Sequence, residues 1–171
     1  MRIDQTNVNF EVYEDSINFC GIAKLTLPNL QQIAESFSGA GIAGNVEAVV
    51  RAHFDAMTLG IDFRTTTEEA IRLMKPERHT LDIRAARQDE DTEAGQIVIA
   101  PVKYIAVVMP KSLNLGSLAP HSRQDASGDY AIRYWATYIE GKLVTELDQL
   151  NYKALIDGKD YLAPVRAALG K

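Results

Sequence analysis

Apolar and polar residues alternate with a period of two in several segments, as they do in half-buried β-strands. The alternation is clearest from Met57 to Arg64, and it recurs at residues 7–12, 17–27 and 81–84. A long, almost continuously apolar segment, 97–109, and a segment rich in aromatic and β-branched residues, 130–139, also favour strands. Glu140-Gly141 predicts a tight turn into residues 142–150, so the last two predicted strands form a hairpin.

A single well-marked helix start interrupts this strand pattern. Thr65 and Thr66 each stand three residues before a glutamate, Glu68 or Glu69, which gives two overlapping capping boxes. Pro76 should end this helix within about two turns. The C-terminal residues 160–169, with Pro164 near their start, favour one or two further helical turns.

The strand-rich pattern without βαβ alternation predicts the fold class. We expect a mainly β protein, an antiparallel β-sandwich or barrel with one short helix packed against it. The length of 171 residues fits a single domain, 1–171. Two segments fit no strand or helix: a Gly-rich arm at about residues 30–45 and a polar loop at about residues 110–129.

Composition and charge exclude several classes of protein. Apolar residues make up 46% of the chain and charged residues 24%, which is ordinary for a globular protein. The net charge of -5 disfavours high-affinity DNA binding. Cys20 is the single cysteine, so neither an intrachain disulfide nor a cysteine-built zinc site is expected. With no secretory signal pattern and no long apolar segment, we expect a soluble chain without a membrane anchor, made in the cytoplasm.

The residues that could carry chemistry form no catalytic set. Gly39-x-Gly41-x-x-Gly44 has the spacing of a dinucleotide-binding loop, but a polar segment precedes it where a buried strand is required. A nucleotide-binding enzyme is therefore a weak alternative. His53, His79 and His121 show no metal-ligand spacing and are expected to face solvent. We predict no catalytic residue, no cofactor and no metal.

The Gly-rich arm is the strongest candidate for a functional surface. Its apolar side chains cannot easily be buried within a segment that contains so many glycines, so we expect them to be covered by another subunit. The predicted subunit-interface residues are Leu30, Ile33, Phe37, Gly39, Gly41, Ile42 and Gly44.

Four stretches of the chain resemble a known family. Residues 21–30, the Gly-rich stretch 35–44, the strand 57–63 and the hairpin 138–151 are similar, in order and spacing, to the major tail tube proteins of contractile-tailed bacteriophages. The resemblance implies a β-sandwich-like subunit without enzymatic activity that assembles as hexameric rings. The rings would stack into the inner tube of a virion tail, built in the host cytoplasm.

The resemblance also implies partners. These are further copies of the chain, the tail sheath protein, and baseplate, initiator and tape-measure proteins, while DNA passes along the lumen without specific binding. A DNA-free injection tube, from an R-type bacteriocin or a type VI-like secretion machine, is the alternative.

If a ring holds six copies, its formal charge is 6 × (-5) = -30, and a lumen of that sign would repel DNA phosphates. Candidate lumen-facing residues are Asp82, Arg84, Arg133 and Thr137.

Overall fold

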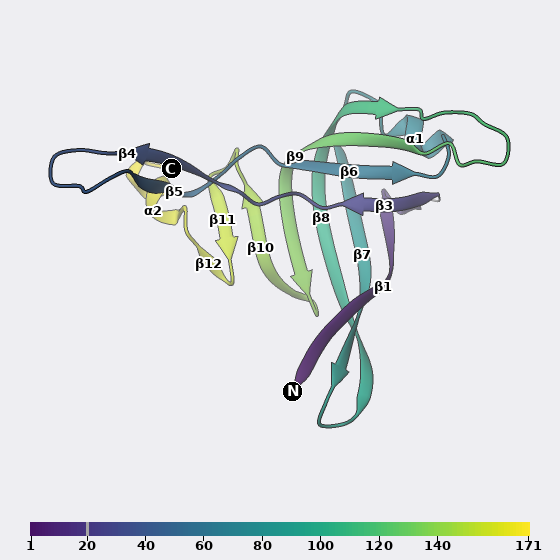
Figure 1. Ribbon diagram of the computed structural model, residues 1–171, viewed down its shortest axis with the longest axis horizontal. Helices are drawn as coiled ribbons and strands as arrows, with labels where there is room; N and C mark the ends of the chain where they lie inside the picture. The colour runs from purple at the N-terminus through teal and green to yellow at the C-terminus, as the bar shows by residue number, and fades with distance from the viewer. Residues whose placement is uncertain (20) are drawn as a thin grey trace.

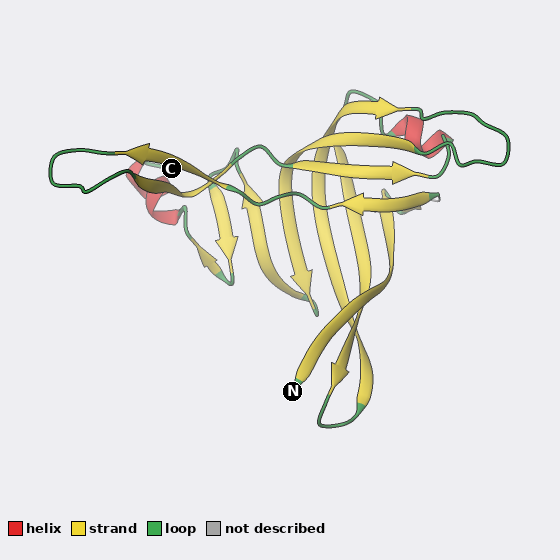
Figure 2. Ribbon diagram, viewed as in Figure 1, coloured by secondary structure: helices red, strands yellow, loops and turns green. Residues whose placement is uncertain are grey.

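The computed structural model describes residues 1–19 and 21–171, and antiparallel strands dominate it (Figures 1 and 2). Strands account for 59% of the chain and helices for 6%, which confirms the mainly β prediction. The elements are β1 (Arg2–Glu14), β2 (Ile17–Asn18), β3 (Ile22–Thr26), β4 (Gln32–Phe37), β5 (Val46–Phe54), β6 (Thr58–Phe63), α1 (Glu68–Arg72), β7 (His79–Asp91), β8 (Gln96–Asn114), β9 (Ala126–Ile139), β10 (Lys142–Asp148), β11 (Lys153–Ile156), β12 (Lys159–Asp160) and α2 (Ala163–Ala168).

The main sheet has ten strands and branches at β9. Its longest path runs β12-β11-β10-β9-β8-β7-β1-β2, while β6 pairs with β9 and β3 pairs with β6. The edge of β9 that faces away from β8 is shared by two strands: Ala126–Ala131 pairs with β6 and Tyr134–Ile139 pairs with β10. Figure 1 shows the result, with β3 and β6 running across β7 and β8. This sheet does not close into a barrel within the described residues.

The core lies where β6 crosses the long strands. Leu59, Ile61 and Phe63 of β6 are at most 1% exposed, and they belong to one cluster with Leu81 and Ile83 of β7. The residues between them on β6 are only partly buried, so β6 has the alternation that the sequence predicted. The strand 57–63 is therefore confirmed, as is the hairpin turn at Glu140-Gly141, where Lys142 pairs with Ile139.

Both helices are short and cover the sheet locally. The side chain that caps α1 is that of Thr67, one residue beyond the predicted capping boxes, and its hydroxyl accepts from the Ala70 amide at 3.2 Å. The helix ends at Arg72, before Pro76, as predicted. α2 has Pro164 in its first turn, where the absent amide hydrogen costs no helical hydrogen bond.

Two segments predicted to lack regular structure are partly strands. The arm at 30–45 contains β4, which pairs with β5 in a separate two-stranded sheet. Local period did not show this strand because polar Glu35 shares a face with apolar Ile33 and Phe37, so apolar and polar residues do not alternate. The loop predicted at 110–129 is shorter, since β8 continues to Asn114 and β9 begins at Ala126. The predicted strand at 17–27 is divided into β2 and β3.

A buried ionic cluster joins β1, α1 and β7. His79 is 3% exposed, so the expectation that it faces solvent is wrong. Its Nδ1 lies 2.5 Å from Oε1 of Glu14, and its Nε2 lies 3.1 Å from the carbonyl oxygen of Lys75. Nε of Arg72 lies 3.7 Å from the second oxygen of Glu14.

Removing the His79 side chain should destabilise the fold. His79→Leu leaves the Glu14 carboxylate and the Lys75 carbonyl without their partner in a buried place, which costs about 3 kcal/mol in the free energy of unfolding. Denaturant unfolding measures the loss. His53→Leu, at an exposed position on β5, is the matched control and should change the free energy by less than about 0.5 kcal/mol. Equal stability of the two variants would contradict this account of the cluster.

Candidate functional site

The hairpin formed by β4 and β5 (residues 32–54, here called the arm hairpin) projects from one end of the molecule (Figure 1). Phe37 pairs with Val46 and Glu35 pairs with Ala48, so these four side chains share one face with Ile33. Ala34, Ser36, Glu47 and Val49 share the other face. Ile33 is 46% exposed, Phe37 is 47% exposed and Val49 is 57% exposed. Apolar side chains are therefore exposed on both faces of this hairpin.

The predicted interface residues all lie on or beside this hairpin. Leu30 precedes β4 and is 43% exposed, and Ile42, in the turn, is 37% exposed. Gly41 and Gly44 have φ values of +91° and +125°, which explains why glycine is needed in the turn. Gly39, the first glycine of the turn, accepts a hydrogen bond from the Ile42 amide through its carbonyl oxygen. The structure thus brings the seven predicted residues into one continuous arm.

The same turn removes the basis of the nucleotide-binding alternative. In a dinucleotide-binding loop the glycines connect a buried strand to the N-terminus of a helix, where the pyrophosphate binds. Here Gly39, Gly41 and Gly44 connect two exposed antiparallel strands. The next helix, α1, begins at Glu68, after β5 and β6.

Two of the four lumen candidates form a charged cluster on the face of the main sheet opposite the core. Two nitrogens of Arg84 donate to Oδ2 of Asp82, at 2.8 Å and 3.2 Å, and Nζ of Lys103 lies 3.4 Å from the same oxygen. The Arg84 guanidinium also lies over the Tyr13 ring, 4.7 Å from its centroid. Both cations of this cluster are thus held by one carboxylate.

The charges around Asp82 determine its titration. Partial burial alone would raise the pKa of its carboxyl, but the hydrogen bonds from Arg84 and the positive charge of Lys103 outweigh burial. The pKa of Asp82 is therefore lowered from its ordinary value. The carboxylate stays ionised near neutral pH and keeps both cations paired.

The other two candidates lie elsewhere. Thr137 is on the core side of β9, where its hydroxyl accepts from Nε1 of the buried Trp135 at 3.1 Å. Arg133 is at a bulge: Ile132 pairs with Val108 and Tyr134 with Val107, so Arg133 has no partner across the ladder. The structure therefore does not place Arg133 and Thr137 with Asp82 and Arg84. Strand register and bulges determine which face of the sheet each of these side chains occupies. Neither can be derived from the apolar–polar period of a single strand.

A groove that the sequence did not indicate lies between β1 and β3. Its volume is about 400 Å³, and its lining is mainly apolar. Phe10 and Ile83 contribute from the long strands, and Leu25 and Leu27 from β3 and the residue that follows it. The groove is apolar because its floor is the edge of the hydrophobic core. In the described part of the chain no further strand covers this edge.

The loop between β8 and β9 is fixed at its base and exposed at its tip. The Gln124 side chain donates to the Thr66 hydroxyl at 2.8 Å and accepts from the Thr66 amide at 3.1 Å, which ties the loop to the segment before α1. A Cβ on Gly116 would lie 1.8 Å from the carbonyl oxygen of Gln124, so only glycine fits there. Leu118 at the tip is 88% exposed.

Within residues 1–19 and 21–171, no group of three or more His, Cys, Asp or Glu side chains could hold a metal ion. Neither helix in this part of the chain has the length and apolar character needed to cross a membrane. The prominent features are thus surfaces: the arm hairpin, the charged cluster and the groove.

Comparisons with known proteins place the chain in a family. No curated protein matches the chain. A solved structure with 11% sequence identity is similar over 76% of this chain and 89% of its own, with a TM-score of 0.39; it is described as a cryo-EM structure of the anti-feeding prophage baseplate, 6-fold symmetrised. The family model for phage tail tube protein FII matches residues 5–170. The expected resemblance is therefore confirmed, and the chain belongs to the phage tail tube protein FII family.

Proposed function

We propose that this chain polymerises as stacked hexameric rings that form the inner tube of a contractile phage tail. Membership of the tail tube family supports a structural role in a virion tail. The observation that carries the assembly step is the arm hairpin, which exposes Ile33 and Phe37 on one face and Val49 on the other. An isolated two-stranded hairpin is at best marginally stable in water, so apolar residues on both of its faces favour burial by other copies.

The charged cluster suggests which surface lines the channel. Asp82 and Arg84 lie on the polar face of the main sheet, whereas the opposite face is covered by β3, β6 and the core. Polar side chains on a sheet face can remain hydrated in a water-filled lumen. We therefore retain Asp82 and Arg84 as lumen candidates and no longer propose Thr137, whose hydroxyl is bonded on the core side.

Conduction of DNA requires weak contact with phosphates. Each cation that neutralises a phosphate adds counterion-release affinity, and several such contacts would slow passage. In the cluster both Arg84 and Lys103 are already paired with Asp82, and the net charge of each subunit is -5.

Sheath, baseplate, initiator and tape-measure proteins are the proposed partners of the assembled tube.

The assembly proposal predicts a visible particle. Purified protein, concentrated alone or together with tail initiator proteins, should form rings or tubes with a central hole in negative-stain electron microscopy. Analytical ultracentrifugation should show the same material as large oligomers. Monodisperse monomer at every concentration and salt tested, also with initiators present, would contradict the proposal.

The lumen proposal predicts that Asp82 limits DNA retention. Wild-type tubes should not retain short duplex DNA at physiological salt in a co-sedimentation assay. Asp82→Asn frees two cations and should raise retention by about tenfold, with a steep dependence on salt. Asp157→Asn, in the turn between β11 and β12, is the matched control with the same charge change. Salt-sensitive retention by wild-type tubes, or equal retention by the two variants, would contradict the proposed lumen face.

A further inference from the structure

A large bulge interrupts the base of the β4–β5 ladder. Between the pairs Gln32–Phe54 and Ala34–Val49, one residue of β4 stands opposite four residues of β5, 50–53. Bulges change the direction in which side chains point, and they are frequent beside functional sites. This bulge lies at the end of the molecule where β5 meets the C-terminal elements β11 and α2 (Figure 1).

The backbone of the bulge is strained at Ala52. Ala52 is 6% exposed and has a φ of +53°, a left-handed conformation that residues with a Cβ rarely adopt. Oε1 of Gln32 accepts from the Ala52 amide at 3.2 Å and so helps to hold this conformation. Strain of this kind persists where the surrounding contacts fix it, and it is concentrated at ligand sites. The neighbouring side chain whose direction the bulge sets is that of Arg51.

The bulge brings Arg51 close to a second cation. The Arg51 guanidinium lies over the Tyr161 ring, 5.6 Å from its centroid, and Nζ of Lys159 lies 5.3 Å from the same centroid. Within residues 1–19 and 21–171, neither cation forms an ion pair with a carboxylate. Two cations at one ring repel each other, so an anion that contacts both is favoured there.

The carboxylate next to these residues in the sequence, that of Asp160, is already occupied. Nη2 of Arg166 donates to its Oδ2 at 2.7 Å. The amides of Ala154 and Leu162 donate to its Oδ1 at 3.3 Å and 3.0 Å. Asp160 is therefore held away from the two cations, which are left for an anion from another molecule.

A pocket of about 370 Å³ opens beside the Arg51 guanidinium. Gln32, Arg51, Ala52, Ile156 and Tyr161 line it, so it contains hydrogen-bond donors and apolar surface but no carboxylate. A guanidinium binds a carboxylate through two parallel hydrogen bonds. The apolar lining suits the methylene stem of an acidic side chain, whereas a phosphate group has no such stem. The pocket therefore favours a carboxylate of a protein over a phosphate.

The pocket opens away from the Asp82 cluster. Ile156 pairs with Thr145, and Thr145 pairs with Thr137, which lies on the core side of the main sheet. Asp82 lies on the opposite face. If the Asp82 face lines the channel, as the proposed function has it, the pocket faces outward, where a protein that surrounds the tube can reach it.

We infer that the pocket at Arg51 and Lys159 binds an acidic side chain from a segment of another protein. The Arg51 guanidinium donates to the carboxylate, Lys159 supplies a second positive charge, and the Tyr161 ring contacts both cations. Only the outward direction of the pocket rests on the proposed function. The chemistry of the pocket follows from the subunit alone.

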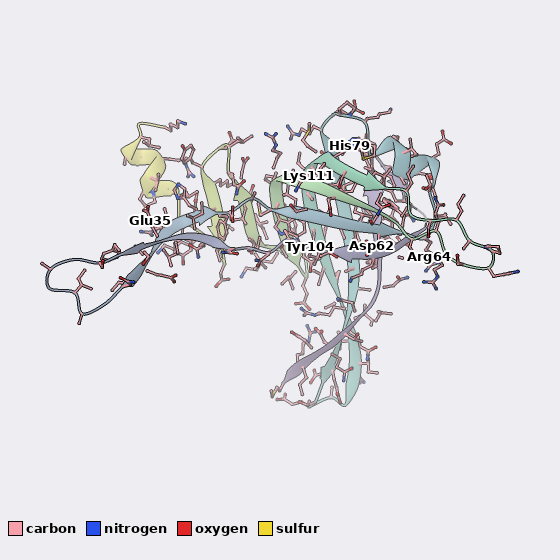
Figure 3. All side chains as sticks on the ribbon, turned by 45° about the horizontal axis from the view of Figure 1, so that its top comes forward. Glu35, Asp62, Arg64, His79, Tyr104 and Lys111 are labelled. Atoms are coloured by element: carbon pink, nitrogen blue, oxygen red, sulfur yellow. The ribbon has the colours of Figure 1, made fainter. Side chains whose placement is uncertain are left out.

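Peptide binding tests the pocket. A fluorescein-labelled peptide of eight glutamates is titrated with the full chain, and anisotropy measures its Kd. Arg51→Gln and Lys159→Gln should each weaken binding at least fivefold. Lys111→Gln is the matched control with the same charge change, because exposed Lys111 lies on β8 in the body of the molecule, away from the arm hairpin that Glu35 marks (Figure 3). It should change the Kd less than twofold, and equal weakening by all three variants would overturn the inference.

Competition identifies the class of ligand. Sodium glutamate should displace the peptide more effectively than sodium phosphate at equal ionic strength, and short duplex DNA should displace it poorly. Stronger displacement by phosphate or DNA would overturn the carboxylate assignment. The variants should keep the wild-type unfolding temperature within a few degrees, since Arg51 and Lys159 are exposed.

Assembled tubes separate this inference from the proposed function. Tubes should bind the peptide as tightly as the dispersed chain does, and Arg51→Gln should assemble normally. Binding by the dispersed chain alone would overturn the outward direction, and failure of Arg51→Gln to assemble would mean that the carboxylate belongs to a second copy. Absence of tubes from the wild-type protein would overturn the tube function and leave peptide binding by the dispersed chain standing.

Discussion

The pairing of one strand, β9, with three others is the constraint on which the rest of the structure depends. β8 covers one edge of β9 along its length, while β6 and β10 divide the other edge at Ile132–Arg133. Because two strands cannot continue side by side from one edge, β6 turns across the sheet and β10 continues it. The turn of β6 across the sheet creates the core and leaves β3 as an edge strand. The pairing of β10 with β9 extends the sheet through β11 and β12.

Patterns contained within one element were predicted well from the sequence. Alternation located β6, the Glu140-Gly141 turn located the β9–β10 hairpin, and Pro76 marked the region where α1 had to end. In each case the determining residues are neighbours in the chain. The N-cap was misplaced by one residue because Thr65, Thr66 and Thr67 are chemically equivalent caps, and packing of Ala70 and Leu73 selects Thr67.

Features that depend on distant pairing were predicted poorly. β4 was assigned to an irregular arm because its own residues do not alternate in polarity: Glu35 shares a face with Ile33 and Phe37. Thr137 and Arg133 could not be assigned to a face, since the bulge opposite Val107 and Val108 shifts the register midway along β9. The arm was nonetheless found, because its exposed apolar residues and glycines are adjacent in sequence. The groove was missed because β1, β3, β7 and β8 all contribute to it.

The proposed function combines two tasks, assembly and passage of DNA, that need surfaces of opposite polarity. Surfaces that bind copies of the chain gain from apolar side chains and free strand edges, because burial and backbone pairing both favour association. A surface that lets a polyanion pass needs the reverse: polar groups that remain hydrated and cations already paired within the subunit. The arm hairpin has the first character and the Asp82 cluster has the second. They lie on different elements, so under the proposed function a change that strengthens assembly need not alter the surface proposed to line the channel.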